Sequence, residues 1–275
     1  FTTSELATNL LELEVIPSKL DIGKLANEWN KEAENYKNQK EFLSDKLSVL
    51  EENQDQPVEP RDVILYGFGR IGRLAARELI KQAGKGQQLR LRAIVTRSSK
   101  DDDIIKRASL LRNDSVHGAF KGSVIEDLDK KALVINGQIV HMISAKTPED
   151  IDYTAYGIKN ALVIDNTGVY TNREALMRHL SAKGTAKVLL TAPGKEIPNI
   201  VYGINQGELD LENENIYSAA SCTTNAISPI LKLMSDKFGI QKGHIETVHA
   251  YTNDQNLLDN MHKKPRRGQI GRAHV

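Results

Sequence analysis

Residues 63–73 read VILYGFGRIGR, an apolar run followed at once by a glycine-rich turn. The apolar part predicts a buried parallel strand, and the spacing of apolar residues over 74–80 predicts a helix directly after the turn. A second apolar run follows at 89–95. Strand, helix and strand in this order predict a βαβ unit.

The three glycines of the turn have the spacing of a dinucleotide-binding fingerprint. Gly67 permits the tight turn, Gly69 lets the backbone approach a pyrophosphate, and Gly72 lets the helix pack on the strand. The amides of Arg70 and Ile71 would then face phosphate oxygens at the helix N-terminus. A plain strand-to-helix turn is the alternative, but the position between a strand and a helix favours a dinucleotide site.

The end of the second strand carries Arg97 between hydroxyl-bearing neighbours. An acidic residue usually accepts hydrogen bonds from the adenosine ribose at this point, and its absence argues against a strict preference for NAD. A cation flanked by hydroxyls suits a 2′-phosphate, which indicates NADP or the use of both cofactors. A solvated surface arginine, with NAD held by other contacts, is the alternative.

Later apolar runs at 161–164 and 187–190 continue a parallel sheet. Residues 130–144 read instead as a hairpin that turns at Asn136 and Gly137. The expected fold is α/β: a Rossmann-type parallel sheet domain over 61–221, preceded by an amphipathic helix and followed by a truncated α+β catalytic domain over 222–275.

Cys222 is the only cysteine of the chain, and it opens an apolar run that predicts a helix over 226–234. A thiol at a helix N-terminus lies at the positive end of the macrodipole, which favours the thiolate. His249 follows 27 residues downstream. Cys222 is therefore a candidate nucleophile and His249 a candidate base. A buried structural cysteine and an ordinary core histidine are the alternatives.

The ordered series of motifs resembles phosphorylating glyceraldehyde-3-phosphate dehydrogenase, from about Asp62 to Gly268. The motifs that carry the resemblance are GFGRIGR at 67–73, NDSVHG at 113–118, NTGV at 166–169, TAPGK at 191–195, SCTTN at 221–225 and TVHAYTNDQ at 247–255.

The resemblance implies a homotetramer that converts glyceraldehyde 3-phosphate and inorganic phosphate to 1,3-bisphosphoglycerate through a cysteine thioester, in glycolysis or gluconeogenesis. It implies catalytic roles for Cys222 and His249. It also implies phosphate-binding and cofactor-binding positions, which are Ser221, Thr223 and Thr252 for phosphates and Thr167, Thr191 and Asn253 for the cofactor. An erythrose-4-phosphate dehydrogenase shares these motifs, and a non-catalytic scaffold that keeps the old fold is the alternative outside enzymes.

The composition excludes several other classes. The net charge is +1, so no global field favours nucleic acid or an anionic membrane. No apolar run is long enough to span a bilayer, and the start does not read as a signal peptide. A single cysteine suits the reducing cytoplasm, and no metal site is expected. The basic stretch 262–267 matches the family's loop near the cofactor of an adjacent subunit better than a nucleic-acid patch.

Residues 1–60 differ from the rest and are absent from the common form of the family. Apolar side chains recur every seven residues, at Ile22, Trp29, Tyr36, Leu43 and Leu50. This stripe predicts one amphipathic helix from about Leu20 to Glu52, docked on the body or on a neighbouring subunit. A polar, proline-bearing linker at 51–60 follows.

The last seven residues, 269–275, read QIGRAHV. They can be encoded by DNA that spells, from its second base, a widely used sequencing adapter. We therefore expect this segment to be an artefact and the chain to be a fragment with a truncated catalytic domain, inactive alone although the full-length protein is an enzyme.

Overall fold

The structure, a computed structural model, describes residues 2–13, 15, 20–51, 60–84 and 89–249. These separate into two compact units. One unit comprises the N-terminal helices up to Arg61 together with residues 78–90, and the other comprises the described residues of 62–77 and 91–249. Among the described residues, no helix combines the length and apolarity that crossing a lipid bilayer requires.

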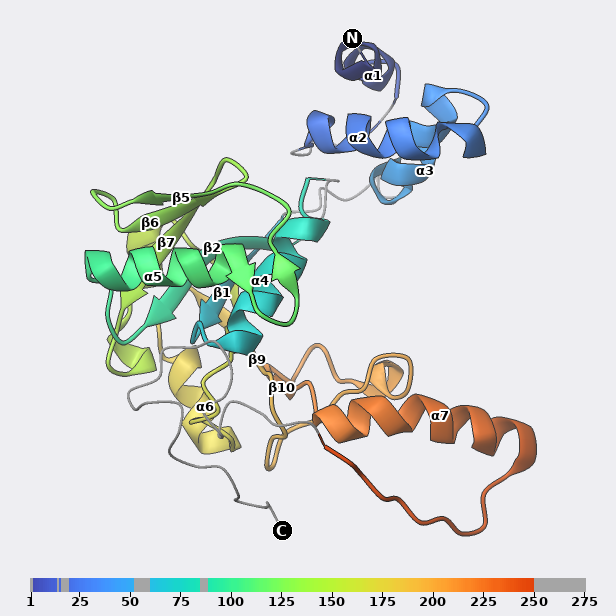
Figure 1. The fold of residues 1–275 in the computed structure, drawn as a ribbon. Coiled ribbons are helices and arrows are strands. Elements are labelled where there is room, and N and C mark those ends of the chain that lie inside the picture. The colour runs from blue at the N-terminus through green and yellow to red at the C-terminus, as the bar shows by residue number, and fades with distance from the viewer. Residues whose placement is uncertain (1, 14, 16–19, 52–59, 85–88, 250–275) are drawn as a thin grey trace. The chain divides into compact units, whose positions relative to one another are not determined.

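An eight-stranded sheet forms the centre of the larger unit (Figure 1). Its strands, in spatial order, are β10 (Ile216–Ser218), β9 (Thr185–Leu190), β8 (Ala161–Asp165), β1 (Arg61–Tyr66), β2 (Leu89–Thr96), β7 (Gln138–Ser144), β6 (Ala132–Ile135) and β5 (Val124–Asp127). The pairs β1–β8, β8–β9, β9–β10 and β2–β7 are parallel. The mostly parallel sheet confirms the predicted Rossmann-type α/β fold.

Local sequence explains the central strands and the hairpin. Val63 to Tyr66 are all buried, as expected of a strand covered on both faces. The predicted hairpin joins β6 and β7, which are antiparallel. Asn136 and Gly137 form its turn with φ of 47° and 77°, the left-handed conformations that asparagine and glycine tolerate best.

Short helical segments connect the strands. The α-helices of this part are α4 (Arg70–Gln82), α5 (Asp101–Arg112), α6 (Arg173–Leu180) and α7 (Cys222–Phe238). The 3₁₀ helices are η2 (Pro148–Asp150), η3 (Tyr153–Tyr156) and η4 (Gln206–Glu208), and β3 (Asn113–Asp114) pairs with β4 (Gly118–Ala119) in a separate small sheet.

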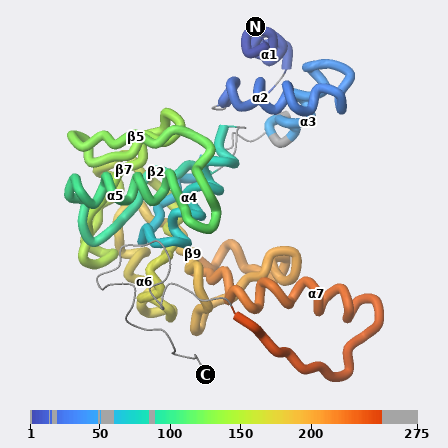
Figure 2. Tube along the Cα trace, viewed as in Figure 1, coloured from blue at the N-terminus to red at the C-terminus, as the bar shows by residue number. Residues whose placement is uncertain are grey.

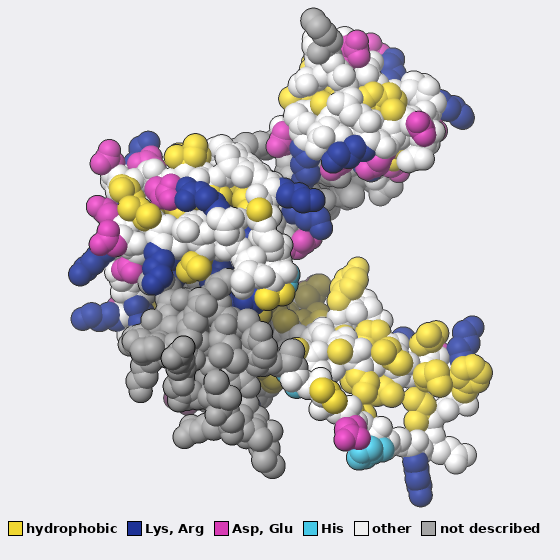
Figure 3. All heavy atoms as spheres, viewed as in Figure 1, with side chains coloured by type: hydrophobic (Ala, Val, Ile, Leu, Met, Phe, Trp, Pro, Cys, Tyr) yellow, Lys and Arg dark blue, Asp and Glu magenta, His cyan; other side chains and the backbone are white. Residues whose placement is uncertain are grey.

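The described part of the expected catalytic domain consists of α7 and the irregular segment 240–249. No residue of α7 is buried, and apolar side chains gather along it (Figure 3). Ile230 and Phe238 are 62% and 79% exposed. Ser221 caps the start of the helix, which has Pro229 in its interior, and its apolar face packs against little of the described chain.

The N-terminal segment differs from the single helix that its heptad pattern predicted. It forms α1 (Thr2–Leu10), α2 (Ile22–Glu32), the 3₁₀ helix η1 (Ala33–Asn35) and α3 (Gln39–Glu51). Tyr36 is extended, and the Asn38 side chain accepts a hydrogen bond from the Glu41 amide at 3.0 Å. Asparagine competes for backbone donors in this way and starts a new helix, so the predicted helix breaks here.

The three helices enclose a small core of their own. Leu6, Leu25, Phe42 and Leu43 are fully buried. The ring of Trp29 packs edge-on against Phe42 at a centroid distance of 5.4 Å. The apolar stripe is therefore buried by folding back on itself rather than along one straight helix.

Residues of α2 and its N-cap also bind the last turn of α4 and the residues just after it. The Lys24 amino group donates to the carbonyls of Lys81 and Ala83, the latter at 2.8 Å. The Asp21 amide donates to the Gly84 carbonyl at 2.8 Å. The last carbonyls of a helix have no partner within it, so these bonds cap the C-terminal end of α4.

Candidate functional site

The glycine turn lies where β1 and β8 end side by side. From β1 the chain proceeds to β2 and β7 on one side, and it returns to β8 and β9 on the other. Such a switch point forms a crevice at the carboxyl ends of the strands, which is where dinucleotides bind in folds of this class. The structure therefore places the predicted fingerprint at the point where the strand order reverses.

The turn has room only for glycine at two positions. Gly67 has φ of 92°, and a Cβ built on it would lie 2.9 Å from Thr167 Cγ2. A Cβ on Gly72 would lie 2.4 Å from the Gly67 carbonyl oxygen. The backbone of the turn and the first turn of α4 are therefore in direct contact, a cradle that fits the pyrophosphate of a dinucleotide.

Helix α4 begins at Arg70, and its first hydrogen bond to the turn runs from the Arg73 amide to the Gly69 carbonyl at 3.0 Å. The first amides of a helix have no intrahelical acceptor, so those of Arg70 and Ile71 suit an anion. The Arg70 guanidinium instead donates to Asp114 Oδ1 at 3.1 Å. The Arg70 side chain is therefore paired with Asp114, whereas its backbone amide could face an anion.

Asp114 anchors this end of α4 as a carboxylate. Burial alone would raise its pKa, but hydrogen bonds from the His117 and Val116 amides and the charge of Arg70 outweigh burial and hold the pKa well below its usual range. The buried Arg73 lies 3.7 Å from the other oxygen of the same carboxylate. The NDSVHG motif had indicated the segment but not this role.

Thr167 and Thr191 follow β8 and β9, and both bind Asp165. The Thr167 amide and hydroxyl donate to Asp165 Oδ1 at 2.8 Å and 2.7 Å. The Thr191 hydroxyl donates to the Asp165 carbonyl at 3.0 Å. Asp165 Oδ2 lies 2.8 Å from His179 Nε2, and both side chains are buried. The sequence analysis did not identify Asp165 or His179. The available signal was an acidic residue, Asp165, at the end of an apolar strand.

Arg97 lies just after β2, at a cavity of about 550 Å³. Its lining consists of cationic and hydroxyl-bearing residues, which are Arg97, Ser98, Ser99, Lys100, Lys131 and Ser144. Arg97 is exposed, and the Ser144 hydroxyl donates to its carbonyl at 3.2 Å. The structure adds Lys100 and Lys131 to the residues that the sequence had singled out.

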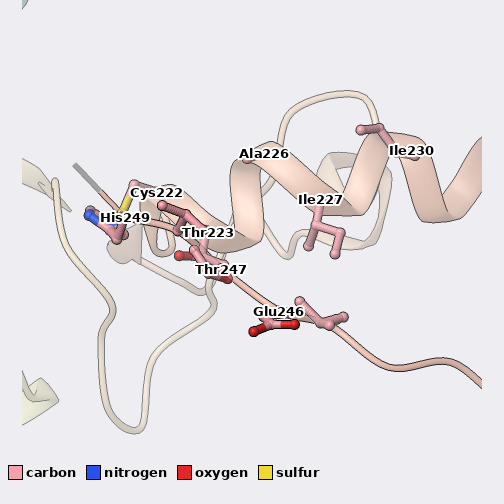
Figure 4. A pocket seen from close by; sticks show the side chains of 10 residues that line it. Cys222, Thr223, Ala226, Ile227, Ile230, Glu246, Thr247 and His249 are labelled. Carbon is pink, nitrogen blue, oxygen red and sulfur yellow. Dashed lines mark hydrogen bonds between the residues drawn. The ribbon is translucent and has the colours of Figure 1, made fainter. Parts of the chain in front are cut away.

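Cys222 is the first residue of α7. Ser221 precedes it as N-cap, and its hydroxyl accepts a hydrogen bond from the Thr224 amide at 3.0 Å. The segment after α7 turns back towards the start of the helix (Figure 2). This return brings His249 Nε2 to 3.2 Å from Cys222 Sγ (Figure 4).

The surroundings of Cys222 favour its thiolate. The hydrogen bond with His249 is the largest effect on the pKa of the Cys222 thiol and lowers it. Burial opposes this effect, and hydrogen bonds with Thr223 add to the lowering. The N-terminus of α7 acts in the same direction. The exposed thiol can therefore react with a molecule that reaches it.

A cavity of about 360 Å³ lies between α7 and the returning segment (Figure 4). Its polar lining consists of Cys222, Thr223, Glu246, Thr247 and His249, and its apolar lining of Ala226, Ile227, Ile230, Ile245 and Val248. Of the other predicted phosphate-binding and cofactor-binding positions, Thr252 and Asn253 lie outside the described residues, as does the basic stretch 262–267. Within the described ranges, no group of three or more His, Cys, Asp or Glu side chains could hold a metal.

Two segments of the chain match models of one protein family. Residues 61–173 match the model described as "Glyceraldehyde 3-phosphate dehydrogenase, NAD binding domain". Residues 221–274 match the model described as "Glyceraldehyde 3-phosphate dehydrogenase, C-terminal domain". The first segment contains the glycine cradle, and the second contains Cys222 and His249.

Relatives carry the same name. A "Glyceraldehyde-3-phosphate dehydrogenase-like protein" of Pseudomonas aeruginosa is 49% identical over 260 residues, 94% of this chain and 56% of its own length. The glyceraldehyde-3-phosphate dehydrogenase of Clostridium pasteurianum is 38% identical over 78% of this chain and 59% of its own length. The "Glyceraldehyde-3-phosphate dehydrogenase 2" of Bacillus subtilis is 38% identical over 75% of this chain and 57% of its own length.

The chain thus spans little more than half the length of these relatives. The Pseudomonas match is longer than the part of the chain that follows Pro60, so it extends into the N-terminal helices. Both domain matches occur in chain order, and the relatives agree with them in name. The chain therefore belongs to the glyceraldehyde-3-phosphate dehydrogenase family.

Proposed function

We propose that the full-length protein oxidises glyceraldehyde 3-phosphate to 1,3-bisphosphoglycerate through a thioester on Cys222. The observation that carries this proposal is the 3.2 Å contact between Cys222 Sγ and His249 Nε2 at the N-terminus of α7. A thiol with a lowered pKa beside an imidazole is the arrangement that nucleophilic catalysis by cysteine requires.

The chemistry follows from these two side chains. The Cys222 thiolate attacks the aldehyde carbon and forms a hemithioacetal, whose hydroxyl proton His249 removes. Loss of hydride from the same carbon leaves a thioester on Cys222. Bound NAD or NADP supplies the hydride acceptor. Inorganic phosphate then attacks the thioester, releasing the acyl phosphate and restoring the thiolate.

The remaining assignments rest on the family. Ser221, Thr223 and Thr252 would bind the phosphates of substrate and attacking ion, and Asn253 would lie beside the cofactor. We place the reaction in the cytoplasm, in glycolysis or gluconeogenesis, and expect a homotetramer. We also propose the boundaries 1–60, 61–221 and 222–275 for the helical extension, the dinucleotide-binding domain and the catalytic domain.

Assays of the full-length protein test the proposal directly. Glyceraldehyde 3-phosphate and erythrose 4-phosphate should each be offered with and without phosphate, using NAD and NADP. We expect phosphate-dependent reduction of the cofactor with glyceraldehyde 3-phosphate. Faster turnover of erythrose 4-phosphate would reassign the substrate, and no turnover of either aldehyde would favour a scaffold.

Replacing His249 with asparagine is expected to slow the alkylation of Cys222 by iodoacetamide at neutral pH. The hydrogen bond between His249 and Cys222 lowers the thiol pKa, so its loss raises the pKa and reduces the thiolate fraction. Each unit of increase reduces that fraction about tenfold below the pKa. The rate profile should therefore move to higher pH.

His244→Asn is the matched control for this measurement. His244 lies in the same irregular segment but does not line the Cys222 cavity. Its replacement should leave the labelling rate unchanged. Equal labelling kinetics in wild type and His249→Asn would remove His249 from the proposed role.

We propose further that Arg97 permits NADP to bind. Arg97 lies at a cavity whose lining is cationic and hydroxyl-rich, which supports a 2′-phosphate at this point. Arg97→Asp is therefore expected to weaken NADP binding about tenfold more than NAD binding, because a charge-assisted contact is lost. Titration of each cofactor measures the ratio, and equal losses for both would refute the assignment.

A further inference from the structure

We propose that Lys131, which begins the β6–β7 hairpin, is a second cation for the adenosine 2′-phosphate and sets the preference between the two cofactors. This inference rests on the proposed dinucleotide function. It concerns a residue from a different part of the chain, and neither the glycine fingerprint nor the end of β2 identifies it.

The cavity beyond β2 is built from three neighbouring strand ends. Thr96 and Ser144 are register partners at the ends of β2 and β7. Lys131 immediately precedes β6, and its carbonyl accepts a hydrogen bond from the Met142 amide of β7 at 2.7 Å. Adjacent strands therefore hold Arg97 and Lys131 at one cavity although they lie far apart in sequence.

The chemistry of the lining selects the ligand. Arg97, Lys100 and Lys131 supply positive charge and Ser99 adds a hydroxyl, while the hydroxyls of Ser98 and Ser144 donate to Asp103 and to the Arg97 carbonyl. The described residues that line the cavity include no carboxylate, although Asp101 pairs with Lys131 beside it. A phosphate monoester has two negative charges and three oxygens that accept hydrogen bonds, so it complements this lining. The uncharged 2′-hydroxyl of NAD would gain little from three cations.

The backbone directs Lys131 to this place. Its φ of 48° lies in the left-handed region, which a residue with a side chain adopts only where the surrounding structure imposes it. The preceding Lys130 binds Asp127 at 3.2 Å and does not line the cavity. Two consecutive lysines therefore have different surroundings, and only the second can serve the site.

Asp101 supplies a competing partner for Lys131. The Lys131 amino group lies 2.5 Å from Asp101 Oδ1, and the two side chains are 48% and 53% exposed. Ion pairs this exposed are weak, so a phosphate dianion can draw the amine away. With NAD bound, Lys131 would stay on Asp101; with NADP bound, it would move to the phosphate. The pair thus accounts for tolerance of both cofactors.

The test measures binding of 2′,5′-ADP and 5′-AMP to this chain by isothermal titration calorimetry, without turnover. Lys131→Asn keeps a residue that tolerates the left-handed region. We expect it to weaken 2′,5′-ADP binding about three- to tenfold and to leave 5′-AMP binding unchanged. Asp101→Asn should strengthen 2′,5′-ADP binding, and Lys130→Asn is the matched control that should change neither.

The outcomes separate the two proposals. The preference for 2′,5′-ADP over 5′-AMP could stay unchanged in Lys131→Asn and Asp101→Asn but fall in Arg97→Ala. That result would overturn the role of Lys131 and keep that of Arg97. Equal binding of both nucleotides by the wild type and all variants would overturn both. Restored 2′,5′-ADP binding in Lys131→Arg would support a charge contact over a change of hairpin shape.

Discussion

Replacing Cys222 with serine is expected to reduce aldehyde oxidation by the full-length enzyme about 10⁴-fold or more while cofactor binding is retained. A serine hydroxyl is almost never ionised near neutral pH, and His249 lowers the pKa of a thiol that is already far more acidic. The substitution changes one atom, so the start of α7 should keep its shape. Steady-state kinetics and cofactor titration measure the two effects.

Ser228→Ala is a suitable control, because Ser228 lies further along α7 and outside the Cys222 cavity. Its activity should match wild type. Oxidation by Cys222→Ser at a tenth of the wild-type rate or more would show that no covalent step through this residue limits the reaction. Joint loss of activity and cofactor binding would indicate a folding defect instead.

Replacing Gly72 with alanine is expected to weaken NAD binding at least tenfold and to destabilise this chain by about 1–3 kcal/mol. The new Cβ would lie 2.4 Å from the Gly67 carbonyl oxygen, and neither atom belongs to a flexible side chain. The turn would have to move away from α4, which would separate the amides that we propose to bind the pyrophosphate. Thermal unfolding and NAD titration measure the two losses.

Gly207→Ala provides the comparison, since a Cβ on Gly207 meets no atom within 4 Å. That variant should unfold and bind NAD as the wild type does. If Gly72→Ala were as stable as the wild type, the glycine turn would be able to move away from α4 at little cost in free energy. Intact NAD affinity in an equally stable variant would argue against pyrophosphate binding at this turn.

Local chemistry explains which parts of the fold could be predicted. The run VILY needs burial on both faces, and the glycine turn permits one route into α4, so β1, α4 and the sheet followed from the sequence. Asn136 and Gly137 fixed the hairpin because few residues adopt two successive left-handed conformations. The N-terminal helix was predicted wrongly: a heptad stripe reports which residues become buried, whereas Asn38 decides where the helix is interrupted.

The candidate site depends more on tertiary contacts. The proximity of Cys222 and His249 could be expected only from the family resemblance, because no local pattern relates residues joined by an irregular segment. Asp165 and His179 meet through the pairing of a strand with a later helix. Lys131 reaches the Arg97 cavity through strand order alone. The spacing of residues along the chain does not predict such tertiary contacts.

Helix α4 has one further property that concerns the history of the chain. Its first turn is the phosphate cradle that we propose, and carbonyls at and just after its other end accept hydrogen bonds from Lys24 and Asp21. A protein that began at β1 would have to satisfy those carbonyls by another route. The N-terminal helices and the end of α4 therefore depend on each other, and a change at Lys24, whose side chain supplies two of these bonds, should destabilise both.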